Sequence, residues 1–130
     1  MNFKTDTKEK FSVICPETGI ISANMTAEME AFILPYLQKD IPHIILKLNG
    51  VSEIDANAAE CIAVMQQKFY AQNASFVICE MQAAVVSVFE KQELIDSLNY
   101  TPTESEAWDI LQMEEIEREL MNDFEDEEDA

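Results

Sequence analysis

Two short apolar runs with a periodic helix between them constrain the fold more than any other feature of the sequence. The runs are 44–48 (IILKL) and 75–79 (SFVIC), each typical of a strand that is buried on both faces. Between them lies a helical pattern of apolar residues, spaced i, i+3, i+4, i+7 and i+11: Ala58, Cys61, Ile62, Met65 and Phe69. Apolar strands that alternate with helices favour an α/β fold.

The remaining elements extend this unit into one mixed sheet of about five strands with four helices packed on it. The other predicted elements are, in chain order, strands at 3–8 and 11–15 that form a hairpin, a helix from Asn24, a helix at 83–91, a strand at 98–101 and a final helix that begins with a capping box of Thr103 and Glu106. Pro35 is expected to kink or end the first helix, because proline removes a backbone hydrogen bond. Asn57 and Glu60 have the spacing of a capping pair at the start of the central helix.

The charge of the chain excludes several classes of partner. A net charge of −18, from 26 acidic and 8 basic residues, would be repelled by the phosphates of nucleic acids and by anionic membrane surfaces. No apolar run approaches the roughly 20 residues that cross a bilayer, so membrane insertion is not expected. The first residues also lack the apolar core of a secretion signal. We therefore expect a cytoplasmic protein.

The residues that most often hold metals or perform catalysis are sparse. Cys15, Cys61 and Cys79 are odd in number, lie in apolar surroundings and show no CxxC spacing, which favours buried free thiols over disulfides or a zinc site. The single histidine, His43, precedes a predicted strand, where a surface or strand-edge position is expected. No GxSxG, Gly-rich phosphate loop or HExxH occurs. We therefore expect a non-catalytic protein without a metal or cofactor.

Residues 45–59 (ILKLNGVSEIDANAA) resemble the central signature of the STAS domain, a family that includes the bacterial anti-sigma factor antagonists. Its members show an apolar strand, a G-V-x-x-[IM]-D turn, and S-S-G-L at the start of a helix. Residues 19–23 (GIISA) resemble the family's earlier G-E-L-D-A stretch, and residues 100–107 (YTPTESEA) its loop and last helix. The resemblance implies a STAS-like domain over residues 1–112, followed by an acidic C-terminal extension over 113–130 whose end is expected to be disordered.

The resemblance further implies that the loops around the central helix, with the exposed face of that helix, bind a regulatory protein such as an anti-sigma factor or a serine kinase. The implied partner-binding residues are Ser22, Asn24, Ser52, Glu53, Asp55, Ala56, Asn57, Ala58 and Glu60. Gln66, Gln67 and Lys68 are further candidates on the helix. For Asp55 and Asn57, capping of the helix is the alternative role.

The chain departs from the family pattern at the position that accepts a phosphate group in the family. In the family, the serine just after the aspartate of the turn accepts the phosphate when partners are switched. Here that position is Ala56, which has no hydroxyl. The resemblance therefore implies constitutive binding, without switching by phosphorylation at residue 56. An accessory subunit of an ATP-binding-cassette transporter is the alternative function, because a missing phosphate acceptor fits that role equally well.

The C-terminal segment carries a second apolar stripe. Ala107, Trp108, Ile110 and Leu111 gather on one side of the predicted final helix, and the second stripe centres roughly 150° away from them. That second stripe consists of Met113, Ile116, Leu120 and Phe124. One straight helix cannot bury both stripes against one sheet. Either the helix breaks near residues 112–113, or the second stripe is a second interface, for a partner or for a second copy in a homodimer or an oligomerising adaptor.

Acidic residues dominate the same segment. Residues 113–130 contain ten acidic residues and one basic residue, Arg118. The run 125–129 is typical of a disordered solubilising tail. It also fits a segment that attracts a basic partner, whereas calcium binding is disfavoured because the glycine and ligand spacing of a calcium loop are missing.

Overall fold

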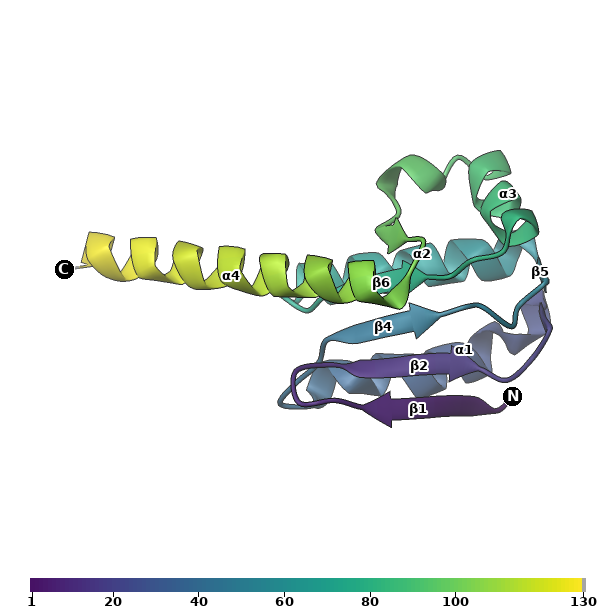
Figure 1. Cartoon of the computed structure of the whole chain (residues 1–130), viewed down its shortest axis with the longest axis horizontal. Coiled ribbons are helices and arrows are strands. Elements are labelled where there is room, and N and C mark those ends of the chain that lie inside the picture. The colour runs from purple at the N-terminus through teal and green to yellow at the C-terminus, as the bar shows by residue number, and fades with distance from the viewer. Residues whose placement is uncertain (130) are drawn as a thin grey trace.

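The computed structural model describes the backbone of residues 1–129 and the side chains of residues 1–121. Its main sheet has five strands in the order β1-β2-β4-β6-β7 (Figure 1). β1 is antiparallel to β2, and every other neighbouring pair in this sheet is parallel. The strands are β1 (Phe3–Thr7), β2 (Ser12–Pro16), β4 (Ile44–Lys47), β6 (Phe76–Cys79) and β7 (Tyr100–Thr101). The prediction of a mixed sheet of about five strands, with a hairpin at its start, is confirmed.

Four α-helices connect and cover the strands, as the sequence predicts. They are α1 (Thr26–Ile33), α2 (Ala56–Ala71), α3 (Ala83–Lys91) and α4 (Glu104–Asp129). Three short 3-10 helices accompany them: η1 (Ala23–Met25), η2 (Leu34–Gln38) and η3 (Ile95–Ser97). The α-helical hydrogen bonding of α1 stops just before Pro35 and continues as the tighter η2, so the early stop predicted at this proline is confirmed.

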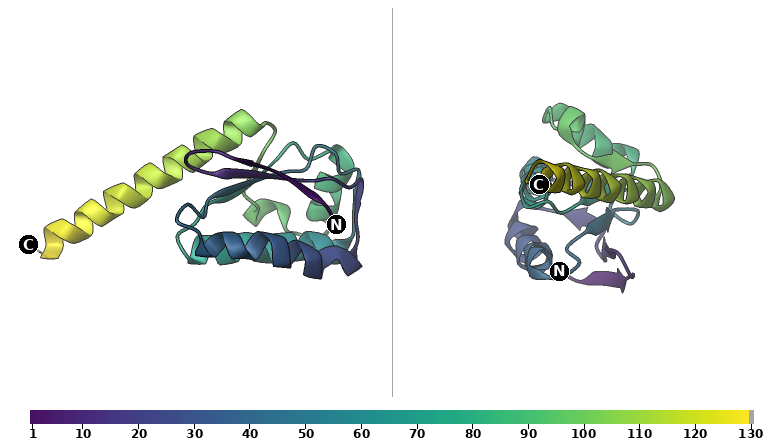
Figure 2. Two further views of the ribbon diagram at one scale, coloured as in Figure 1. Left: turned by 90° about the horizontal axis from the view of Figure 1, so that it is seen from below. Right: turned by 90° about the vertical axis from the view of Figure 1, so that its left-hand side faces the viewer.

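The two faces of the main sheet are covered by different helices. Alternate side chains of β4, Ile44 and Leu46, point into the core that α1, α2 and α3 close. Ile45 points to the opposite face, where α4 packs with Ala107 and Leu111. Figure 2 shows α1 and α2 along one side of the sheet and α4 crossing the other. Coverage of both faces explains why these strands are continuously apolar.

A second, smaller sheet lies where the main chain leaves the carboxyl ends of β2 and β4. It consists of two strands of two residues each, β3 (Ile20–Ile21) and β5 (Glu53–Ile54), which pair in parallel. Ile21 and Ile54 are buried, whereas Ile20 and Glu53 are exposed. The small sheet thus anchors two loops to the core through one side chain of each strand.

Helix α4 is continuous from Glu104 to Asp129, so the break considered near residues 112–113 does not occur. The Thr103 hydroxyl oxygen accepts a hydrogen bond from the backbone N–H of Glu106 at 3.2 Å, which confirms the Thr103 half of the predicted capping box. Beyond the sheet, α4 extends well past the rest of the fold (Figures 1 and 2). No helix among the residues described has both the length and the apolar character to cross a bilayer.

Candidate partner-binding surface

Backbone hydrogen bonds of the small sheet bring two loops that are about 30 residues apart in sequence against each other. The carbonyl of Gly19 accepts hydrogen bonds from the backbone N–H groups of Ser52, at 2.8 Å, and Glu53, at 3.2 Å. It also accepts one from the Ser52 hydroxyl at 3.1 Å. The N–H of Asp55 donates to the carbonyl of Ile21 at 2.9 Å. The loop before α1 is therefore held beside the loop that begins α2.

The side chain of Asp55 adds the contact that fixes the first loop to the start of α2. Its Oδ2 accepts a hydrogen bond from the backbone N–H of Ala23 at 2.9 Å. On either side of Ala23, the Ser22 hydroxyl donates to the Asn24 side-chain oxygen. These contacts order an exposed surface of polar side chains at the N-terminal end of α2.

We name this area the β3–β5 surface and define it by eight residues: Ser22, Asn24, Ser52, Glu53, Asp55, Ala56, Asn57 and Glu60. All of them except the half-buried Ser22 are exposed. The structure thus gathers eight of the nine residues that the sequence proposed for partner binding. Ala58 does not reach this surface, because its side chain is completely buried in the core. Three members of the surface are carboxylates and none is basic, so it favours a partner with basic or neutral polar groups.

The predicted capping pair of Asn57 and Glu60 is wrong. Helix α2 begins at Ala56, and Asp55 occupies its N-cap position. The Asp55 carboxylate bonds to Ala23 in the neighbouring loop rather than to an N–H group of its own helix. Helix starts keep up to four backbone N–H groups without a partner inside the helix. Exposed Ala56 and Asn57 therefore lie at the positive end of the helix dipole, with backbone donors available to a partner.

Gln66, another candidate for partner binding on α2, lies in the core instead of on the exposed face of the helix. It is almost fully buried, and its Nε2 donates to the carbonyls of Phe76, at 2.8 Å, and Asn99, at 2.9 Å. Its Oε1 accepts a hydrogen bond from the N–H of Asn99 at 3.0 Å. The sequence contained a signal for this role, because Gln66 lies four residues after Ile62, within the apolar stripe. Gln67 and Lys68 remain exposed.

Sequence reasoning also missed a polar network between α2 and α4. The hydroxyl of Tyr70 donates to Oε1 of Glu114 at 2.9 Å, and the side-chain amide of Asn99 donates to Oε2 of Glu114 at 3.2 Å. Burial, and next the charge of Glu114, raise the pKa of Tyr70 well above its usual value. Arg118 donates from Nη2 to the hydroxyl of Ser75 at 2.8 Å. The helix beyond residue 112 is thus bonded to the rest of the domain.

The histidine and the three cysteines belong to no cluster of potential metal ligands in the described part of the chain. Nδ1 of half-buried His43 accepts a hydrogen bond from the N–H of Ser75 at 3.0 Å, at the starts of β4 and β6. All three cysteines are free thiols. Burial, together with a hydrogen bond to Glu30, raises the pKa of Cys61 to about 12. No group of three potential metal ligands comes together among the residues described.

An α/β domain with a polar surface at the start of its central helix is the class that these observations define. A sequence model of the STAS domain matches residues 2–107. The chain belongs to the STAS domain family. No curated protein sequence matches the chain.

Solved structures share this fold. The anti-sigma factor antagonist SpoIIAA in its unphosphorylated form is 18% identical, with a TM-score of 0.67, and the match covers 85% of this chain and 96% of that one. An anti-sigma-factor antagonist (STAS) domain protein from Planctomyces limnophilus is 15% identical, with a TM-score of 0.73 and coverage of 85% and 97%. The Bacillus cell fate determinant SpoIIAA in the phosphorylated form is 18% identical, with a TM-score of 0.61 and coverage of 83% and 97%. At these identities the likeness establishes the fold.

Proposed function

We propose that this protein is a non-catalytic regulatory module that binds another regulatory protein, an anti-sigma factor or a serine kinase, through the β3–β5 surface. Membership of the STAS domain family supports this proposal, as does the likeness in fold to anti-sigma factor antagonists. The proposal concerns a stable protein–protein contact and requires no cofactor.

One observation carries the choice of surface. The hydrogen bond from Ala23 N–H to Asp55 joins two loops that meet only in the folded chain, and it leaves the first residues of α2 exposed beside them. A surface that is already ordered loses less conformational entropy on binding than a mobile loop. The donors at the start of α2 and the three carboxylates around them then give the partner a defined polar pattern to match.

Residue 56 determines the kind of regulation. Ala56 is exposed at the first position of α2, where the resemblance places the family's phosphate acceptor, but a methyl group cannot accept phosphate. The nearby hydroxyls of Ser22 and Ser52 are hydrogen-bonded to Asn24 and Gly19. Binding is therefore constitutive in this proposal and is controlled by the abundance of the chain or by an input elsewhere.

The test is capture of partners by the tagged full-length chain from its native lysate, with identification and quantification by mass spectrometry. The variant Asn57→Lys/Glu60→Lys neutralises the net charge of the β3–β5 surface, because two lysines then face the two remaining carboxylates, and it leaves the Asp55 contact intact. The matched control is Ala71→Lys, which adds a lysine at the exposed far end of the same helix. An anti-sigma factor or kinase that is retained by the wild type and the control, but lost by the double variant, supports the proposal. Equal capture by all three proteins would contradict the choice of surface.

Two further readouts separate the alternatives. The intact mass of the chain isolated from its lysate is expected to show no phosphate, and phosphate on Ser22 or Ser52 would overturn constitutive binding. A stable stoichiometric complex with an ATP-binding-cassette protein would instead favour the accessory-subunit function, which the absence of a hydroxyl at Ala56 fits equally well.

A further inference from the structure

Helix α4 presents an apolar stripe that the domain does not cover. Met113, Ile116 and Leu120 have large apolar side chains, and these are 61%, 55% and 53% exposed. We call these three residues the α4 seam. Phe124, which the sequence places in the same stripe, lies outside the described side chains. The seam points away from the sheet, because the domain-facing side of α4 carries Ala107, Leu111 and Arg118.

The spacing of the seam is that of a helix–helix contact. Met113 and Leu120 are seven residues apart and Ile116 follows Met113 by three, so they correspond to positions a, a and d of a heptad. The flanking e and g positions are then Glu117 and Glu119. A second helix with its own apolar seam would bury these side chains in the way that paired helices do.

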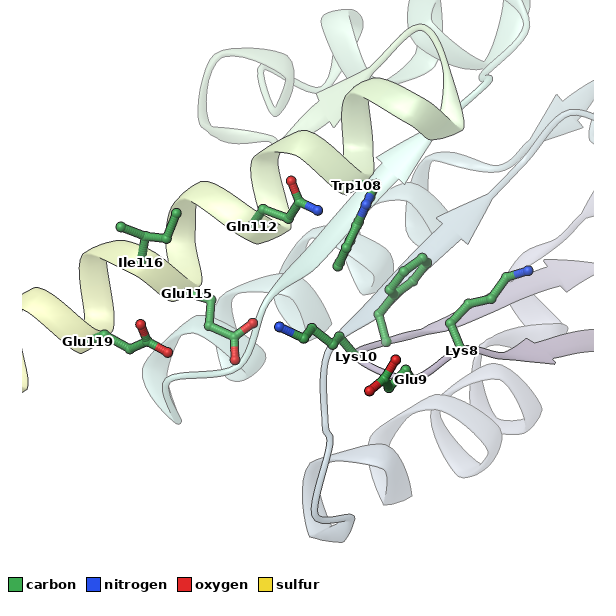
Figure 3. A pocket seen from close by; sticks show the side chains of 9 residues that line it. Lys8, Glu9, Lys10, Trp108, Gln112, Glu115, Ile116 and Glu119 are labelled. Atoms are coloured by element: carbon green, nitrogen blue, oxygen red, sulfur yellow. The ribbon is translucent and has the colours of Figure 1, made fainter.

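A cavity beside the seam widens this apolar area. It has a volume of about 500 Å³ and lies between the β1–β2 hairpin and α4, and Ile116 belongs to both the seam and the cavity (Figure 3). Its floor includes the stacked rings of Phe11 and Trp108, whose centroids are 4.5 Å apart. The charged side chains that line this cavity differ between its two walls: Glu115 and Glu119 come from α4, whereas Lys8, Glu9 and Lys10 come from the turn between β1 and β2 (Figure 3). Carboxylates therefore adjoin the apolar groups on the α4 side of the cavity.

The acidic residues beside the α4 seam determine which kind of partner can bind to it. A second copy paired in the antiparallel direction would place e positions near e positions and g positions near g positions, and Glu117 and Glu119 occupy these positions. A parallel pair would bring together the two acidic runs at 125–129, with five acidic residues each. Both arrangements are opposed by repulsion, since residues 113–130 carry ten acidic residues and one basic residue. An anionic membrane would be repelled for the same reason. A helix with lysine or arginine beside its apolar seam would meet carboxylates on both flanks.

We infer that the α4 seam binds a basic amphipathic helix of another protein, with apolar residues at its a and d positions and lysine or arginine at its e and g positions. This surface is separate from the β3–β5 surface, which lies at the opposite end of the molecule (Figure 1). The chain then has two binding surfaces and can connect two proteins.

Fluorescence anisotropy with labelled peptides tests the inference on the full-length chain. The first probe is a basic peptide of three heptads with leucine at a and d and lysine at e and g. The second has the same composition in an order that spreads the leucines around the helix, and the third has glutamate in place of lysine. We expect the basic amphipathic peptide to bind with a dissociation constant on the order of micromolar, and both other peptides to bind at least about tenfold more weakly.

Variants locate the binding. Ile116→Asp/Leu120→Asp is expected to lower the affinity for the basic amphipathic peptide by about tenfold or more, because the seam loses its apolar surface. Val64→Asp, which alters an exposed apolar residue on α2, is the matched control and is expected to bind as the wild type does. Glu117→Lys/Glu119→Lys should reduce the preference for the basic over the acidic amphipathic peptide, because the flanks of the seam lose their carboxylates. All these side chains are exposed, so circular dichroism should show the wild-type fold.

Three results would overturn the inference. Equal binding of the amphipathic and reordered basic peptides would show unspecific attraction to an acidic chain. Undiminished binding by Ile116→Asp/Leu120→Asp would place the contact elsewhere. A wild-type dimer at micromolar concentration in sedimentation velocity that the same variant dissociates would show that a second copy occupies the seam.

Discussion

The carboxylate of Asp55 accepts a hydrogen bond from the backbone N–H of Ala23 at 2.9 Å, across 32 residues of sequence. Asp55 is the N-cap residue of α2, and Ala23 begins η1 in the loop before α1. Asp55 thus directly follows strand β5 of the small sheet, precedes the central helix and holds the neighbouring loop. It is a positioning residue for the β3–β5 surface, separate in role from the exposed Asn57 and Glu60 that a partner would contact.

Loss of this contact is expected to loosen the surface at a modest cost in stability. Asp55→Ala should lower the free energy of unfolding by about 1 kcal/mol, because one exposed hydrogen bond to a charged acceptor is lost. Asp55→Asn keeps an acceptor oxygen and should retain most of it. Urea denaturation followed by circular dichroism measures both, with Glu60→Ala as the control on the same surface. The role assigned to the carboxylate would be wrong if Asp55→Ala and Glu60→Ala were equally stable.

Loss of the buried side-chain amide of Gln66 is expected to lower the free energy of unfolding more than loss of the Asp55 contact. Gln66→Leu should lower the free energy of unfolding by about 2–3 kcal/mol, because the N–H of Asn99 and the carbonyls of Asn99 and Phe76 lose partners inside the protein. The same substitution at exposed Gln67 should stay within about 0.5 kcal/mol of the wild type. Chemical denaturation gives both values. Similar values for the two variants would contradict a structural role for Gln66.

Stability is expected to depend on pH through His43. Burial, and next the charge of Arg118, lower the pKa of His43 below 6.5, while Glu115 and Glu114 oppose the shift. The unfolded chain therefore binds the proton more readily than the folded one, so the stabilisation is present above pH 6.5 and is lost as the pH falls toward the folded pKa. Protonation of Nδ1 would also remove the bond from Ser75 N–H.

His43→Asn isolates this effect, because it keeps a hydrogen-bond acceptor and does not titrate. The unfolding free energy of the wild type relative to this variant is expected to decrease between pH 8 and pH 5, as measured by urea denaturation at each pH. A difference that stays constant over this range would show that His43 has the same pKa in the folded and unfolded chains.

Helix α4 should stabilise the domain beyond the boundary that the sequence suggested at residue 112. A chain that ends at Gln112 loses the bonds of Glu114 to Tyr70 and Asn99 and that of Arg118 to Ser75, and we expect a loss of about 2 kcal/mol in unfolding free energy. A chain that ends at Met121 retains them and should lie within about 0.5 kcal/mol of the full length. Thermal and urea unfolding compare the three chains. Equal stability of the two shortened chains would show that the stable domain ends at residue 112, as the sequence suggested.

The predictable part of the fold rests on patterns that lie within single segments. The apolar runs around Ile45 and Val77 are buried on both faces, and the spacing of Ile62 and Phe69 belongs to one long helix, so local periodicity suffices for both. Pro35 acts through its own ring, and its effect was also predictable. The resemblance to the STAS domain then located the loops that the small sheet brings together.

The unpredicted part depends on contacts between distant segments. β3 and β5 have two residues each, too few to show a strand pattern, and they exist because their partners lie beside them. Helix α2 begins at Ala56, before the predicted cap Asn57, and the carboxylate of its N-cap residue Asp55 bonds to Ala23 in a distant loop, which no local pattern indicates. Glu114 and Arg118 looked like parts of a charged extension, and only the arrangement of α4 over the sheet brings them to Tyr70 and Ser75.

The edges of the main sheet limit how the chain can associate with itself. β1 is the outer strand on one side, with four of its five residues exposed, among them Lys4 and Asp6, and the outer strand on the other side, β7, has only two residues. Charged or very short edge strands resist the strand addition from which aggregates grow. The proposed control by abundance requires that the chain stay monodisperse as its concentration rises, and this pair of edges disfavours the joining of sheets edge to edge.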